Sequence, residues 1–285
     1  MNINQYKIGK AVIEIRSPFE LQNEPPFSDY LCENEIADYI VNFEISDEIV
    51  CEVEKISYES RRYVMIKKEE KSFFYYKDID GGRNGYYACR IAEENQHSCK
   101  ILVKPYFAEN FYQAILFETI GLEEIFAQSN QSIFHSSYLN VDGQAILFTG
   151  PCEIGKSTQA DLWAKYRNVE IVNGDKSVLY VKDGVAMAGA LPFSGSSSFC
   201  VKKDLPIKAI VILSKKLFNA AKRLEGIESF LAVYKSCYPV EYSQKLMNSQ
   251  INLAQDICKN TAVYKFGCLP DKTAVEYLER FINGS

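Results

Sequence analysis

The feature that most constrains this chain is the segment GPCEIGKS at 150–157, which matches the pattern GxxxxGK[ST] without a gap. An apolar run, AILFT at 145–149, directly precedes the segment, and a helical pattern follows from about Lys156 to Tyr166. A strand, a glycine-containing loop and a helix in this order form the context in which the motif binds phosphate groups. The sequence therefore predicts a phosphate-binding loop within an α/β domain.

Physical chemistry assigns a role to each part of such a loop. Successive backbone N–H groups at a helix N-terminus converge on one point, where the helix dipole favours negative charge. Gly150 and Gly155 let the backbone curl around a phosphate group without a Cβ clash. We expect Lys156 to reach the β- and γ-phosphates and Ser157 to offer its hydroxyl to Mg²⁺. The predicted nucleotide-binding residues are Gly150, Pro151, Cys152, Glu153, Ile154, Gly155, Lys156, Ser157 and Thr158.

Two carboxylates bear on this site. Glu153 places a negative side chain on a loop built for an anion, so we expect it to point outward or towards a metal. Asp175 lies 19 residues after Lys156, just past a strand-like run at 170–172, where it could hold Mg²⁺ directly or through water. The alternative is an ordinary turn aspartate, because Asn-Gly-Asp is a good turn sequence by itself.

His135 is the remaining candidate for the chemistry. It lies on the strand-like run at 133–141, and adjacent strands could bring its ring near the same phosphates. From spacing alone, a hydrogen-bonded strand histidine without a chemical role is the favoured alternative. The hydroxyl-rich stretch SGSSS at 194–198 is interpreted as a mobile substrate loop, with a plain linker as the alternative. The residues assigned to substrate contact are Ser194, Gly195 and Ser196 of this stretch, together with Lys176 and Lys202.

Charge is distributed unevenly along the 285 residues. The net charge of −5 divides into −9 for residues 1–130, with 23 acidic and 14 basic residues, and +4 for the remainder. The half that contains the glycine loop is thus the half that more easily receives an anion. Domains commonly contain about 100–200 residues, so the chain length and the change in charge together predict domains at 1–128 and 129–285.

Composition excludes several classes of protein. A hydrophobic content of 47% is too high for a disordered chain, and the net charge gives no support for nucleic-acid binding. We find no apolar run of about 18 residues and no secretory signal, so we expect a cytoplasmic protein without a membrane partner. Nine cysteines without a CxxC pair, together with only two histidines, predict reduced thiols and no zinc cluster.

The periodicity of apolar residues predicts a different architecture in each half. Alternating runs up to about residue 103, separated by turn signals such as 80–85, predict an antiparallel β-rich module. Residues 107–126, with Phe111 and Ile115 among the apolar positions, predict one or two helices interrupted near Gly121. Beyond residue 130, strand and helix patterns mix, and IKAIVIL at 207–213 is the predicted central strand. Helices are expected at about 226–235, 243–258 and 271–282.

At this point the chain resembles the HPr kinase/phosphorylase-related kinases, which share a nucleotide core with ATP-dependent phosphoenolpyruvate carboxykinase. The resemblance covers about 130–285. It rests on FHSS at 134–137, LFTGP at 147–151, GKST at 155–158, LW at 162–163, NGDK at 173–176, GALPF at 189–193, PIKAIV at 206–211, CLPD at 268–271 and AV at 274–275.

This resemblance implies a fold, an activity and site residues. The implied fold is a P-loop-containing, carboxykinase/HPr kinase-like α/β core with a mixed sheet, here preceded by the β-rich module. The implied activity is ATP- and Mg²⁺-dependent phosphate transfer to a hydroxyl. In the family, a histidine fifteen residues before the first loop glycine belongs to the active site, which is the spacing of His135 from Gly150. His135, Asp175 and Lys156 are therefore the candidate catalytic residues.

The chain also departs from the family. The paired acids of the family fall on Gly174 and Asp175, so the first acid, usually credited as the base, is missing. The signature of true HPr kinase/phosphorylases is not evident, which indicates a relative with another substrate, such as serine or a serine-containing peptide. The alternative is a degenerate nucleotide-binding accessory protein that recognises a peptide or protein partner. A carboxykinase-like decarboxylation is a weaker interpretation, and the sequence leaves homo-oligomerisation open.

Overall fold

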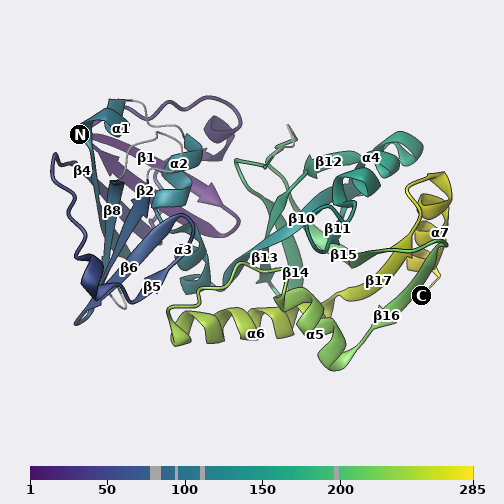
Figure 1. Ribbon diagram of the computed structural model, residues 1–285. Coiled ribbons are helices and arrows are strands. Elements are labelled where there is room, and N and C mark those ends of the chain that lie inside the picture. The colour runs from purple at the N-terminus through teal and green to yellow at the C-terminus, as the bar shows by residue number, and fades with distance from the viewer. Residues whose placement is uncertain (78–84, 94–95, 110–112, 196–198, 285) are drawn as a thin grey trace. The chain divides into compact units, whose positions relative to one another are not determined.

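The computed structural model describes residues 1–77, 85–93, 96–109, 113–195 and 199–284. The chain forms two compact units, one of Met1–Lys7 with Ala11–Ile125 and one of Ile8–Lys10 with the residues from Phe126 onward (Figure 1). Among the described residues, no helix combines the length and the apolar character needed to cross a membrane.

A nine-stranded sheet forms the first unit, in the order β3-β1-β2-β4-β9-β8-β7-β6-β5. Its strands are β1 (Asn2–Ile8), β2 (Ala11–Ser17), β3 (Leu31–Cys32), β4 (Tyr39–Ile45), β5 (Tyr58–Glu59), β6 (Tyr63–Lys68), β7 (Lys71–Lys77), β8 (Tyr86–Glu93) and β9 (Ser98–Val103). The short 3₁₀ helices η1 (Phe27–Tyr30) and η2 (Val53–Lys55) lie in the connections.

The prediction of an antiparallel sheet is wrong for the middle of this unit. Strand β4 runs parallel to β2 on one side and to β9 on the other, so the sheet is mixed. Both links are long enough to cross over, because 21 residues separate β2 from β4 and four strands separate β4 from β9. Alternating apolar residues predict a strand and its buried face, but they do not determine which strand it pairs with or in which direction.

Three helices follow this sheet: α1 (Pro105–Glu109), α2 (Gln113–Thr119) and α3 (Leu122–Gln128). The predicted interruption near Gly121 is confirmed, since Gly121 lies between α2 and α3 with a φ of +71°. A Cβ at Gly121 would lie 2.5 Å from Cζ of the buried Arg90, which forms a 2.8 Å ion pair with Glu124. Phe111 and most of the predicted turn at 80–85 lie outside the described residues.

An eight-stranded mixed sheet forms the second unit. Its strands follow the order β11-β10-β13-β14-β15-β17-β16, β12 pairs with β10, and β11 also pairs with β15. The strands are β10 (Gln131–Val141), β11 (Gln144–Thr149), β12 (Glu170–Asn173), β13 (Lys176–Lys182), β14 (Val185–Ala190), β15 (Asp204–Lys215), β16 (Ala220–Leu224) and β17 (Ala262–Cys268). The helices are α4 (Lys156–Arg167), α5 (Gly226–Tyr234), α6 (Gln244–Asn260) and α7 (Lys272–Asn283).

Two long strands organise this sheet. The first half of β10 pairs with β13 and its second half pairs with β11. The segment IKAIVIL lies within β15, which runs parallel to β11 on one side and to β17 on the other, so its predicted central position is confirmed. Helices α4 and α6 lie on opposite sides of these strands (Figure 1). The strands β16 and β17 are additional to those predicted.

Candidate functional site

The segment 150–155, named the phosphate loop for its predicted role, connects the end of β11 to the start of α4. Gly150 and Gly155 have φ angles of +142° and +110°, values that side chains rarely permit. A Cβ at Gly150 would also lie 3.3 Å from the carbonyl oxygen of Leu213 on β15. Glycine at 150 therefore lets the loop pass close to the backbone of β15.

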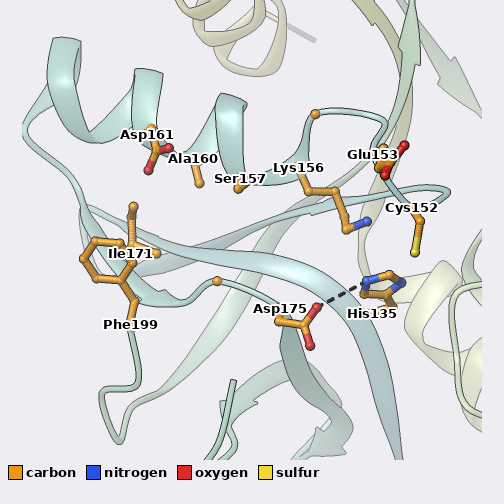
Figure 2. Close-up of a pocket in the computed structure, with 12 residues that line it drawn as sticks. His135, Cys152, Glu153, Lys156, Ser157, Ala160, Asp161, Ile171, Asp175 and Phe199 are labelled. Atoms are coloured by element: carbon orange, nitrogen blue, oxygen red, sulfur yellow. Dashed lines mark ion pairs between the residues drawn. The ribbon is translucent and has the colours of Figure 1, made fainter. Parts of the chain in front are cut away.

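Lys156, the first residue of α4, turns back over this loop. Its side chain donates to the carbonyl oxygens of Gly150, at 3.2 Å, and Pro151, at 3.1 Å. Only 9% of the residue is exposed, and this burial lowers the pKa of its ammonium group. Figure 2 shows the ammonium pointing across the site towards His135 and Asp175.

A cavity of about 540 Å³ lies in front of the loop. Its lining includes these residues singled out from the sequence: His135, Cys152, Glu153, Gly155, Lys156, Ser157 and Asp175. It also includes Ala160, Asp161, Ile171, Gly174 and Phe199, which the sequence did not single out for binding. The other predicted loop contacts, Gly150, Pro151, Ile154 and Thr158, do not line it.

His135 and Asp175 face each other within this cavity, with Nε2 of the ring 3.4 Å from Oδ1 of the carboxylate (Figure 2). His135 comes from β10, where it is the register partner of Lys176 on β13, so the residue before Lys176 is brought beside it. The hydrogen bond from His135 is the main reason why the pKa of Asp175 lies well below its usual range, and Lys176 adds to the shift. Asp175 is thus held as a carboxylate.

The buried hydroxyl of Thr149 ties the two halves of the site together. It donates to the carbonyl oxygen of His135 at 2.6 Å, so the last residue of β11 holds the β10 backbone next to the loop. The backbone N–H of Ser136 donates to the carbonyl oxygen of Asp175 at 3.0 Å. The positions of His135 and Asp175 are therefore determined by sheet pairing as well as by their side chains.

Asn173 organises the turn that presents Asp175, a role that sequence reasoning missed. Its side-chain oxygen accepts from the backbone N–H groups of Asp175, at 3.0 Å, and Lys176, at 2.9 Å. Its amide donates to the carbonyl oxygen of Phe193 at 3.0 Å, and the whole residue is buried. The signal was the Asn-Gly-Asp turn sequence, since asparagine side chains commonly bond to the backbone two residues on.

Gly174 stands where the resemblance places the first acid of the family. It lines the cavity, and its carbonyl oxygen accepts from the hydroxyl of Ser137 at 3.0 Å. The cavity therefore has a backbone surface at this position and no carboxylate. His135 on β10 and Asp175 in the turn before β13 are the titratable lining groups next to this position.

The predicted substrate residues fall into three groups. Lys176 pairs with Asp175, and its ammonium lies 5.9 Å from the ring centroid of Phe193. Gly195 lies against the Asp175 carboxylate, since a Cβ there would be 2.9 Å from it, and Ser194 is its half-buried neighbour. Lys202 is exposed and does not line the cavity, and Ser196 lies outside the described residues.

The oxygen atoms of this cavity fit a magnesium ion bound together with phosphates. Ser157 and Asp175 both line it, and Mg²⁺ is commonly held by one or two protein oxygens with substrate phosphates and water. Within the described part of the chain there is no group of three or more His, Cys, Asp or Glu residues placed to hold a metal by itself. Such a set of donors fits an ion that arrives with a nucleotide.

Comparison with known proteins gives a weak likeness among solved structures. No family model matches the chain, and no curated protein matches it. Among solved structures, the chain is similar to the Hpr(Ser) kinase/phosphatase from Coxiella burnetii, at 14% identity and a TM-score of 0.34. The match covers 53% of this chain and 95% of that one. At this TM-score the match establishes neither the family nor the activity of the present chain.

Proposed function

We propose that the second unit is an ATP- and Mg²⁺-dependent phosphotransferase that moves the γ-phosphate to a hydroxyl group. The observation that carries this proposal is the juxtaposition, in one cavity, of Lys156 and Ser157 with the His135–Asp175 pair. The first two are the cation and hydroxyl that a triphosphate needs, and the pair is a base with its orienting carboxylate. The carboxykinase-like core implied by the sequence resemblance is part of the proposal.

The phosphate loop would stabilise the negative charge of the phosphoryl group during its transfer. Backbone N–H groups at the start of α4 and the Lys156 ammonium would hold the β- and γ-phosphates. The ammonium rests on two loop carbonyls and would exchange these for phosphate oxygens. When bound, Mg²⁺ would neutralise charge on the phosphates, with Ser157 and Asp175 as its protein oxygens.

His135 is the proposed general base. In the tautomer with its proton on Nε2, the ring donates to Asp175 Oδ1 and leaves Nδ1 able to accept a proton. The acceptor hydroxyl loses its proton to Nδ1 as its oxygen bonds to the γ-phosphorus. The bond from that phosphorus to the β–γ bridging oxygen breaks, and ADP leaves. The low pKa of Asp175 makes it a weak base, so besides binding Mg²⁺ it would orient His135 and would not take the proton itself.

The proposed acceptor is a hydroxyl compound such as serine or a serine-containing peptide. Gly195 lies beside Asp175, so this residue would border the place where an acceptor meets the base. The first unit, whose net charge is negative, is proposed to recognise the acceptor or a partner protein. The location we propose remains the cytoplasm.

A transfer assay tests this function. The protein is incubated with Mg²⁺ and ATP labelled in the γ-phosphate, together with free serine, a serine-containing peptide or cell lysate. We expect a labelled product that Lys156→Ala abolishes. Lys165→Ala, which removes an exposed lysine of the same helix, should leave the product unchanged. Tight ATP binding without transfer to any acceptor would contradict the proposal.

Gly174 supports a second candidate, a nucleotide-binding accessory protein without catalysis. The family's first acid is replaced there by a glycine whose backbone lines the cavity. Gly174→Asp separates the two candidates. If the natural protein transfers no phosphate and the variant does, the accessory function is the better account.

A further inference from the structure

The loop between β15 and β16, residues 216–219, carries two strongly exposed apolar side chains. This loop, named the tip, crosses the end of β17, which lies between the two strands in the sheet. Leu217 is 93% exposed and Phe218 is 60% exposed. Exposing apolar side chains to water is unfavourable, so two adjacent ones in a short loop indicate a surface that contacts a ligand or partner. The proposed catalytic cavity does not include them.

This tip lies at the same edge of the sheet as the phosphate loop. Strands β11 and β15 are parallel, with Thr149 opposite Ile212, so both end at that edge. Ligands of α/β sheets bind at the carboxyl ends of parallel strands. Leu217 follows Leu213, the neighbour of Gly150, by four residues and lies two residues beyond the end of β15.

The direction of a bound nucleotide follows from the strand order. Strand β11 lies between β10 and β15. His135 and Asp175 are on the β10 side, so the reacting γ-phosphate belongs there. The rest of the nucleotide extends away from the reacting group, across the phosphate loop and towards the β15 side. The nucleobase would then arrive at the tip, residues 216–219.

Hydrogen bonds connect the tip to the phosphate-loop helix. The amide of Gln159, in the second turn of α4, donates to the carbonyl oxygen of Leu269 at 3.1 Å. The N–H of Leu269 donates to the side-chain oxygen of Asn219 at 2.9 Å, and the Asn219 amide donates to Thr273 at 2.8 Å. The tip is thus fixed relative to the helix that starts with Lys156.

We propose that Leu217 and Phe218 form a platform for the nucleobase of the nucleotide held by the phosphate loop. Every base has an apolar π-face, and aromatic side chains stack on such faces with little preference for one base over another. The ammonium of Lys216 lies 5.4 Å from the ring centroid of Phe218, which keeps a positive charge near the path of the phosphates. This inference rests on the proposed function.

Comparing two ligands isolates the base. Calorimetry with Mg²⁺ measures the affinity of the full chain for ATP and for inorganic tripolyphosphate, which has the phosphates without the base. We expect the Leu217→Ser/Phe218→Ser variant to bind ATP about tenfold more weakly and tripolyphosphate with unchanged affinity. Ile227→Ser is the matched control, because Ile227 is 66% exposed on α5, beyond the opposite end of β16, and should change neither affinity.

Each outcome decides the question. Unchanged ATP affinity in the double variant overturns the platform and leaves the proposed function standing. Equal loss of affinity for both ligands also overturns it, because the tip would then support the loop and not the base. If the unaltered protein binds neither ligand, the proposed function fails and the platform fails with it.

Discussion

Glu153 of the phosphate loop has a strained backbone conformation, and its negative charge is unfavourable for binding phosphate groups. Its φ is +60°, in the left-handed region that costs an ordinary residue roughly 1–2 kcal/mol. Its exposed carboxylate lines the cavity that would receive phosphates. The sequence allowed two orientations, outward or towards a metal, and these lead to opposite effects of removing the charge.

Replacing Glu153 with Gln tests which orientation applies. The backbone conformation is retained and only the charge is lost, so repulsion of the phosphates falls. We expect Mg²⁺–ATP to bind several-fold more tightly, in line with about 1 kcal/mol for charges a few ångströms apart in water. Calorimetric titration measures this change, with Glu225→Gln outside the loop as control. Weaker binding would show that the carboxylate helps to hold the metal.

Single residues also show where sequence reasoning stops. The spacing from His135 to Gly150 and from Lys156 to Asp175 was visible in the sequence, and the structure places all but Gly150 on one cavity. The place of Phe199 in the cavity was not visible in the sequence, because this residue lies in the long connection between β14 and β15. A side chain's place in a site is readable when a motif or a strand register determines it, and not when a long connection does.

At the scale of elements, α4 is the element on which the site depends. It carries Lys156 and Ser157 at its start, and Trp163 anchors it further along. Trp163 is 1% exposed and packs on Phe148 of β11, with ring centroids 6.1 Å apart. The strand and the helix that flank the phosphate loop are thus held together by this contact.

Truncating Trp163 should loosen that contact. We expect Trp163→Ala to lower the free energy of unfolding by about 3–5 kcal/mol, the usual cost of replacing a buried aromatic side chain with alanine. Urea denaturation followed by far-ultraviolet circular dichroism measures the loss. Val185→Ala, at a half-exposed strand position, should cost far less. A loss for Trp163→Ala as small as that of the control would mean that α4 is held elsewhere.

Element types were more predictable than their partners. Helices α4 to α7 follow apolar residues at helical spacing, and their ends fall within a few residues of the expectation. Strand β17 was missed because its seven residues lie between two long helices without a strong turn signal. The parallel pairing of β4 was also missed, because direction depends on contacts between residues far apart in the chain.

At the scale of the whole molecule, charge and architecture change at nearly the same place. The structure divides the chain between Ile125 and Phe126, apart from Ile8–Lys10. Residues 131–285 carry a net charge of +4 and contain the phosphate loop, whereas residues 1–130 carry −9. Because opposite charges attract, the positive second unit favours an anionic ligand and the negative first unit favours a basic one.

The central claim is that one site both binds ATP and transfers its phosphate, and two variants measured side by side test it most directly. ATP affinity and transfer rate are determined for His135→Gln and Lys156→Ala. We predict that His135→Gln retains the affinity and loses about a hundredfold or more in rate, as expected for removal of a general base. Lys156→Ala should lose both. A His135→Gln protein that transfers phosphate at the original rate would contradict the account.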